Sequence, residues 1–207
     1  MINLFINPYY NVLRDEEFKT CLKKNEQNKF IDRIIFVREN DKATFQDFFY
    51  ATHKYPNDVN IISNLDIYFD DTIELAQTIK HSECYSLTRW EQLGGNIMKF
   101  TDRHPDTPAC WSQDAWIFYG AVNLEGFEFV MAINTERNLS EKIQFTMGIP
   151  GSDNKLAAML KAANYKVTNP SLSIRAIHLH KEESRNYGQY RILQGIKPWG
   201  LVMQTTL

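Results

Sequence analysis

Asn64 and Asp66 are the side chains whose position most clearly predicts chemistry, because they directly follow the apolar run 59–63. A run of this length, rich in β-branched residues, is typical of a buried parallel strand. In open α/β sheets, ligands lie just beyond the carboxyl ends of such strands. The oxygens of Asn64 and Asp66 therefore predict a site for a divalent cation and a diphosphate. The alternative is an Asx turn that only closes the strand.

Asn7, Tyr9 and Arg14 follow the first apolar run, at positions 2–6. An aromatic ring at a strand end can stack on a nucleobase, and a guanidinium can bind phosphate through two parallel hydrogen bonds. These residues predict the nucleotide-binding part of the site. A tyrosine packed at the start of a helix and a solvated arginine are the alternative interpretation.

Asp153 follows the turn 148–152, which contains two glycines and a proline. Glycines allow a substrate to approach the backbone closely, and a carboxylate at a pocket rim can accept a proton from a sugar hydroxyl. We therefore regard Asp153 as a candidate general base. Its competing role is that of a helix N-cap, for which Asp is a favoured residue.

His178 and His180 alternate along a predicted strand, which puts both imidazoles on one face. A neutral imidazole there can complete the coordination of a cation held by Asp66. Nitrogen ligation favours Mn²⁺, although Mg²⁺ stays possible. Two half-buried strand histidines without a ligand are the alternative.

Asp114 lies between Trp111 and Trp116, a combination that suits carbohydrate, because rings stack on sugars and carboxylates bind their hydroxyls. It is a second catalytic candidate, or an ordinary turn aspartate. Arg89, at the end of a predicted strand, can contact the donor or the acceptor, or it can simply pair with Glu91.

The elements that must position these residues alternate between strand and helix in the first half of the chain, which predicts an α/β fold with parallel pairing. We expect strands at 2–6, 31–37, 59–63 and 84–88, and helices at 15–24, 44–53 and 70–79. The segment 92–112 predicts an irregular excursion. Beyond it we expect strands at 117–122, 127–133, 142–147, 166–168 and 174–180, a helix at 153–164 and a covering tail from 181.

Length and composition bound the class of protein. A chain of 207 residues, 43% of them hydrophobic, suits one α/β domain spanning 1–207. A formal net charge of -2 gives no general attraction to nucleic acid. Three widely spaced cysteines and the absence of a signal-peptide pattern indicate a reducing, cytoplasmic location. No stretch approaches the roughly 20 apolar residues that span a bilayer.

The order of these motifs resembles that of galactosyltransferase-type GT-A glycosyltransferases. Asn64-Leu65-Asp66 aligns with their Asp-x-Asp motif, the loop 8–14 with their Pro-Tyr-Arg-Asp-Arg, and 147–164 with their Gly-Trp-Gly-Gly-Glu-Asp-Asp-Asp-Leu. A later histidine is common to both. The chain departs from the family at Asn64, at Ser152-Asp153 in place of Glu-Asp, and at Ile149 in place of Trp.

The chain also resembles a compact glycosyltransferase domain that forms the N-terminal part of a longer chlorella-virus protein that builds capsid glycans. Both resemblances imply a GT-A-like domain with a mixed, mostly parallel central sheet flanked by helices. The nucleotide would bind the half 1–91, and the acceptor and catalytic groups would lie in 92–207.

The function implied is transfer of a sugar from a UDP-sugar to the hydroxyl of a carbohydrate or glycoprotein, in the cytoplasm of the host if the chain is viral. Asn64 and Leu65 would contact the donor, Asp66 would bind the metal, and inversion is the expected outcome, with retention left open.

Three alternatives remain. A nucleotidyltransferase would share the strand-end acids and the metal, but it favours a glycine-rich loop after the first strand, and 7–11 contains no glycine. A non-catalytic carbohydrate-binding module would rest on Trp90, Trp111 and Trp116. A DNA-modifying glycosyltransferase would need a separate DNA-binding part.

Overall fold

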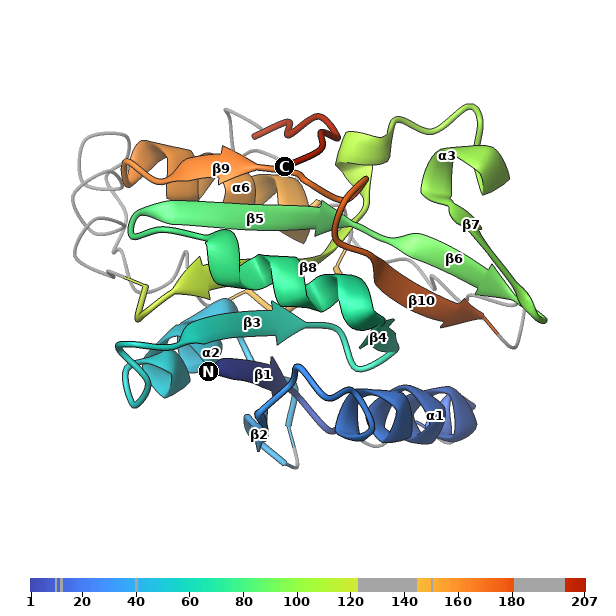
Figure 1. Ribbon diagram of the computed structural model, residues 1–207, viewed down its shortest axis with the longest axis horizontal. Helices are drawn as coiled ribbons and strands as arrows, with labels where there is room; N and C mark the ends of the chain where they lie inside the picture. Colours follow the sequence, from blue (N-terminus) through green and yellow to red (C-terminus); the bar gives the residue numbers. More distant parts are fainter. Residues whose placement is uncertain (10, 12, 40, 123–144, 150, 181–199) are drawn as a thin grey trace.

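The computed structural model describes residues 1–207 except 10, 12, 40, 123–144, 150 and 181–199. The described residues form two sheets with helices packed against them (Figure 1). The six-stranded sheet has the order β2 (Arg33–Phe36), β1 (Ile2–Ile6), β3 (Val59–Ser63), β8 (Gln113–Tyr119), β5 (Glu83–Thr88), β9 (Lys166–Thr168). The four-stranded sheet has the order β4 (Ile67–Phe69), β10 (Ala176–His180), β6 (Trp90–Leu93), β7 (Asn96–Lys99).

The helices are α1 (Asp15–Glu26), α2 (Phe45–Thr52), α3 (Phe100–Arg103) and α6 (Ser152–Ala162), with 3-10 helices η1 (Asp71–Thr78) and η2 (Ala109–Trp111). Two apolar cores lie on opposite faces of the six-stranded sheet. One core packs Phe45 and Phe48 of α2 and Leu156 of α6 against Trp116 of β8. The other packs Ile73 of η1 against Ile61 of β3 and its neighbours.

The direction of the strands determines which residues meet at each edge. β1 pairs in parallel with both β2 and β3, and β5 pairs in parallel with β9. β8 runs antiparallel to both of its neighbours, β3 and β5. The carboxyl ends of β1, β3 and β5 therefore lie at one edge together with the amino end of β8, and this edge faces the second sheet (Figure 1).

The expectation of an α/β fold is confirmed, but the expectation of a mostly parallel sheet is wrong, because the sheet is mixed. An apolar run has the same pattern in a parallel and in an antiparallel strand. The sequence therefore does not show that β8 runs antiparallel to its neighbours. β8 also spans 113–119 where we expected 117–122, and it is followed by Gly120, whose φ is +75°. A Cβ at position 120 would lie 2.7 Å from the Pro56 carbonyl oxygen, which is too close for any residue other than glycine without a shift of the backbone.

The segment 92–112 is not the irregular excursion we expected. It contains the end of β6, a turn at Gly94-Gly95, β7, α3 and η2, and β6 and β7 form an antiparallel hairpin. The 70–79 helix is present as the 3-10 helix η1, with Asp70 as its cap. β4 was missed.

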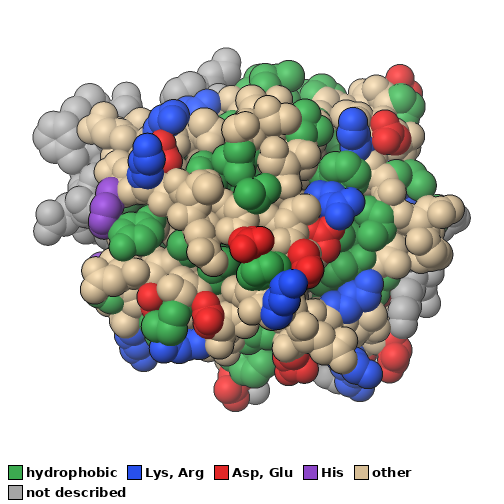
Figure 2. All heavy atoms as spheres, in the orientation of Figure 1, with side chains coloured by type: hydrophobic (Ala, Val, Ile, Leu, Met, Phe, Trp, Pro, Cys, Tyr) green, Lys and Arg blue, Asp and Glu red, His purple; other side chains and the backbone are tan. Residues whose placement is uncertain are grey.

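The expected strand 127–133 and the first half of the expected strand 142–147 lie outside the described residues, as does the tail 181–199. Thr146 forms an isolated bridge with Thr44. None of the helices in the described part of the chain combines the length and apolar character needed to cross a bilayer. Acidic and basic side chains are interspersed with apolar ones on the face seen in Figure 2.

Candidate functional site

A cleft of about 530 Å³ lies at the edge of the six-stranded sheet where β1, β3 and β5 end, a volume in the usual range of small-molecule sites. Most of the site residues expected from the sequence line it. They are Asn7, Tyr9, Arg14, Asn64, Leu65, Asp66, Arg89, Asp114 and Asp153. Segments far apart in the sequence therefore converge on one cavity, in the position expected for ligands of α/β sheets.

Asp66 lies in the turn between β3 and β4 and is 7% exposed. Its Oδ2 accepts a hydrogen bond from the Arg14 guanidinium and lies 2.9 Å from Nε2 of His178, 112 positions later. Burial alone would raise the pKa of Asp66, but the charges and hydrogen bonds of His178 and Arg14 hold it well below its usual range. Asp66 is therefore ionised at neutral pH.

His178 is held from both sides. Its Nε2 faces Asp66, and its Nδ1 lies 3.2 Å from Oε2 of Glu91, whose side chain is fully buried. Burial alone would lower the pKa of His178, but Asp66 and Glu91 raise it. Both ring nitrogens therefore face a carboxylate oxygen, and the tautomer of His178 decides which of them donates. His180 lies two positions along β10, and its side chain is outside the described residues.

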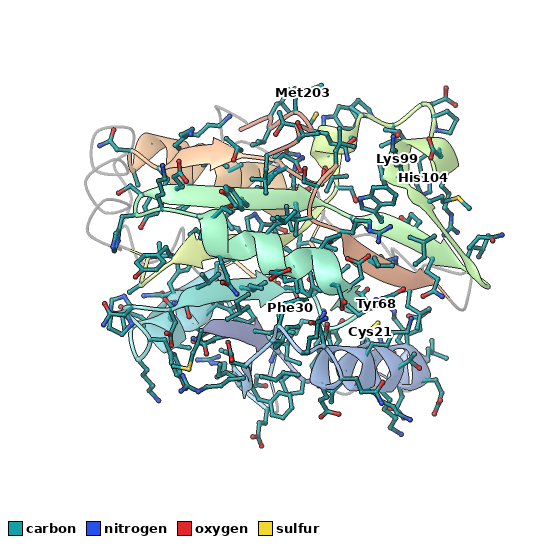
Figure 3. All side chains as sticks on the ribbon, viewed as in Figure 1. Cys21, Phe30, Tyr68, Lys99, His104 and Met203 are labelled. Carbon is teal, nitrogen blue, oxygen red and sulfur yellow. The ribbon has the colours of Figure 1, made fainter. Side chains whose placement is uncertain are left out.

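Glu91 gathers several cationic groups around one buried carboxylate. Its Oε1 accepts from Nε of Arg89 at 2.6 Å, and Nη1 of Arg103 lies 3.5 Å from its Oε2. His104, at the end of α3 next to β7 in Figure 3, approaches Oε1 to 3.6 Å. Glu91 therefore fixes the orientation of His178 and Arg89 together.

Asp114 is bound through both carboxylate oxygens. Oδ1 accepts from Nδ2 of Asn64 at 2.6 Å, and Oδ2 accepts from Nη1 of Arg89 at 2.8 Å. The Arg89 contacts make a continuous link from Asp114 to Glu91 and on to His178. The interpretation of Arg89 as a partner of Glu91 is confirmed. Asp114, with both oxygens engaged, is better suited to position neighbours than to accept a proton.

Asp153 has a different environment. It lies in the first turn of α6, whose N-cap is Gly151, so Asp153 is not the helix cap. Its oxygens accept backbone N–H groups from Asn154 at 2.9 Å and Gln113 at 3.3 Å. Burial raises its pKa to about 7, and repulsion from Asp114 adds to the rise while the backbone N–H groups oppose it. A carboxylate with this pKa accepts and releases a proton near neutral pH.

The loop after β1 is organised by Asn7. Its amide donates to the carbonyls of Val37 and Asp41, at 2.8 and 2.9 Å, and its Oδ1 accepts from the N–H of Ala43 at 2.9 Å. The Asn7 side chain therefore fixes the backbone at Val37, Asp41 and Ala43, a role that we did not expect from the sequence. The neighbouring Tyr9 ring packs edge-on to Phe18, with centroids 5.5 Å apart.

No known protein family and no curated protein matches this chain. Its function must therefore be inferred from the side chains that line the cleft.

Several residues in or next to the cleft were not expected from the sequence. Lys42 lines the cleft with its Nζ 5.4 Å from the centroid of the Tyr9 ring, and Gln113 lines it beside Asp153. Glu91 was noticed only as a partner of Arg89. The alternation that predicts β10 could have indicated that His178 needs a buried partner, but the identity of that partner depends on the pairing of His178 with Glu91 between β10 and β6.

Proposed function

We propose that the protein is a cation-dependent glycosyltransferase with a GT-A-like fold, which transfers a sugar from a UDP-sugar to a hydroxyl of a carbohydrate or glycoprotein acceptor. The proposal rests on two carboxylates in one cleft whose pKa values are shifted in opposite directions. The pKa of Asp66 is lowered, and the pKa of Asp153 is raised to about 7. Titratable groups whose surroundings separate their pKa values in this way divide into a charge-holding group and a proton acceptor.

Asp66 and His178 fit a cation when Nε2 of His178 is unprotonated, because histidine binds metal through a neutral imidazole. Oδ1 of Asp66 is buried and, among the described residues, has no hydrogen-bond partner. Oδ2 of Asp66 and Nε2 of His178 are 2.9 Å apart, close to the spacing of about 3 Å between neighbouring ligands of one Mn²⁺ or Mg²⁺ ion. Glu91 on the opposite nitrogen of His178 is the partner that histidine ligands commonly have.

The described residues contain no group of three or more His, Cys, Asp or Glu side chains that could hold a metal. The protein would therefore contribute Asp66 and His178, with the diphosphate of the donor filling other positions, as is common for such ions. Mn²⁺ suits the mixed oxygen and nitrogen set best. The cation would act as a Lewis acid toward the charge that develops on the departing nucleotide.

The donor side of the cleft is the part near β1 and α1. Tyr9 and Lys42 border it, and we assign them to the nucleoside. Arg14 provides a fixed positive charge next to Asp66, and the Asp66 and Glu17 carboxylates keep its pKa above the ordinary value although burial alone would lower it. Arg14 can therefore bind the diphosphate as a permanent cation.

Asp153 is the proposed base. It takes the proton of the acceptor hydroxyl, whose oxygen forms a bond to the anomeric carbon of the donor sugar. The bond from that carbon to the diphosphate oxygen breaks, and its electron pair leaves with UDP. Attack from the side opposite the diphosphate inverts the configuration at the anomeric carbon. Asn64, Asp114 and Arg89 position one another along the cleft floor.

The test is a thermal-denaturation titration of UDP, GDP, CMP and ATP, each with and without Mn²⁺. At a hundredfold excess over Kd, UDP should stabilise the protein by about 2.7 kcal/mol, or roughly 5–10 °C in Tm, only when Mn²⁺ is present. Asp66→Asn should abolish the Mn²⁺-dependent part of the shift. Asp71→Ala, which removes an exposed carboxylate outside the cleft, should leave it unchanged.

A shift with ATP alone would favour the nucleotidyltransferase. An unchanged Mn²⁺-dependent shift in Asp66→Asn would contradict the proposed cation site. The absence of a shift with every nucleotide would leave the carbohydrate-binding module as the better interpretation.

A further inference from the structure

Trp111 is a large aromatic side chain at the rim of the cleft, and it is 57% exposed. It ends η2, and the residues that follow, Ser112 and Gln113, also line the cleft. Apolar side chains of this size are usually covered, so an exposed indole beside a cavity provides a surface for a ligand.

The other tryptophans of the described residues do not offer such a surface. Trp116 is 1% exposed and packs edge-on against Phe45, with ring centroids 5.1 Å apart. Trp90 donates its indole N–H to the carbonyl of Ser171 at 2.7 Å, and the Arg175 guanidinium lies over its ring at 5.6 Å. Trp111 therefore differs from them in being both exposed and part of the cleft lining.

Trp111 is also close to the proposed base along the backbone. The N–H of Gln113, two residues later, donates to Oδ2 of Asp153 at 3.3 Å. Two residues of backbone span at most about 7 Å, which is on the scale of one pyranose ring. A sugar that lies on the Trp111 ring can therefore bring a hydroxyl to Asp153.

Two buried polar atoms of the cleft-lining residues have no hydrogen-bond partner among the described residues. One is Oε1 of Gln113, whose Nε2 donates to the carbonyl of Cys110 at 2.8 Å. The other is Nε1 of Trp116, an N–H donor. Buried polar atoms are normally satisfied, so an acceptor and a donor left open beside a cleft indicate a polar ligand.

We propose that Trp111, Gln113 and Asp153 form the binding site for the acceptor sugar, a pyranose that places its apolar C–H face on the Trp111 ring. Oε1 of Gln113 accepts one sugar hydroxyl, and Asp153 receives the proton of the hydroxyl that reacts. This inference rests on the proposed glycosyltransferase function, which it extends by assigning the acceptor class and the part of the cleft that binds it.

The test is saturation-transfer-difference NMR with the methyl glucosides, galactosides, mannosides and xylosides in both anomeric forms, recorded in the presence of UDP and Mn²⁺. At least one of these probes should receive saturation at its ring protons from the wild-type protein. Trp111→Ala should weaken binding of that probe by on the order of tenfold, the loss expected for one aromatic contact. Trp111→Phe, which keeps an aromatic face, should retain most of it.

Tyr50→Ala is the matched control, because Tyr50 is 55% exposed and does not line the cleft. It should bind the probe as the wild type does. Equal binding by Trp111→Ala and wild type, or no saturation transfer to any of these pyranosides, would overturn the acceptor site.

The same samples separate this inference from the function on which it rests. Trp111→Ala should keep the full Mn²⁺-dependent thermal shift with UDP, because Trp111 is assigned to the acceptor alone. Loss of the shift in this variant would overturn that assignment. A wild-type protein that binds the sugar but not UDP would instead overturn the glycosyltransferase and support a carbohydrate-binding module.

Discussion

Asp66 and Asp153 are the same kind of side chain, and the protein gives them different properties through their neighbours. Asp66 lies between two cationic groups, whereas Asp153 is buried near a second carboxylate, Asp114. One is therefore fixed as an anion, and the other exchanges its proton near pH 7. This separation makes the two sides of the cleft chemically distinct.

The raised pKa of Asp153 predicts the pH dependence of transfer. Below its pKa of about 7 the carboxyl is protonated and cannot accept the acceptor's proton, so kcat/KM should fall as the pH is lowered through that value. Asp153→Asn should reduce kcat by about 10²–10⁴-fold, while the Mn²⁺-dependent shift with UDP is kept. A variant that keeps the wild-type rate and pH profile would exclude Asp153 as the base.

Glu91 should influence cation binding through His178. Glu91→Gln should weaken Mn²⁺ binding, measured calorimetrically in the presence of UDP, by about 10–100-fold, since a charged partner of a histidine ligand has this effect. In a His178→Ala background the same change should have little further effect. Glu83→Gln, which removes a carboxylate paired with Lys166 on the surface, is the control. Equal losses in the two backgrounds would show that Glu91 acts independently of His178.

At the residue scale the sequence predicts which side chains meet but not what holds them. The strand-end rule placed Asn64, Asp66 and Arg89 at one edge, and these residues do line one cleft. It could not indicate that Asn7 fixes the backbone at Val37 and Asp41, because these partners lie 30 or more positions away. The roles in binding and catalysis stay predictions.

At the scale of elements, α2 connects helix stability to the cleft. Thr44 and Asp47 form a capping box, in which each side chain accepts the other's backbone N–H. The helix carries Phe48, which is fully buried and lines the cleft. The start of α2 is therefore fixed by its own residues, while its position depends on the core.

Thr44→Ala should lower the free energy of unfolding by about 1 kcal/mol, because it removes the oxygen that caps α2. The change is measured by urea denaturation. Thr20→Ala, in the interior of α1, is the matched control, and it should be neutral or slightly stabilising because Ala is the better helix former. Equal losses in both variants would contradict the assigned role of the cap.

The four-stranded sheet could not be predicted from the sequence. β4, β6 and β7 are three or four residues long, too short to show a periodic pattern. β4 and β6 pair with β10, and β7 pairs only with β6, so the sheet as a whole depends on contacts between distant segments. The long strands and helices with a continuous apolar face were predictable, and their neighbours and directions were not.

At the scale of the whole molecule, side-chain contacts that start from the cleft join the two sheets. Asp114 is the second residue of β8 in the six-stranded sheet, and Glu91 and His178 belong to β6 and β10 of the four-stranded sheet. Arg89 lies between them and bonds both acids. A ligand bound at Asp66 and His178 would therefore stabilise the contact between the sheets.

Hydrogen exchange should report this coupling. UDP with Mn²⁺ should slow amide exchange in β10 and in the turn 64–66 more than in β9, which pairs with β5 at the far edge of the six-stranded sheet. Asp66→Asn should remove the difference. A uniform slowing across both sheets would contradict the local coupling.

The 112 positions between Asp66 and His178 also set an order of events during synthesis. Asp66 emerges from the ribosome with β3, whereas β10 is the last strand of the described chain to appear. A nascent polypeptide that has not yet reached residue 178 possesses the acidic half of the proposed cation pocket without its imidazole. On the proposed function, competence to engage a charged donor would therefore arrive late in translation, and a chain cut before β10 would never acquire it.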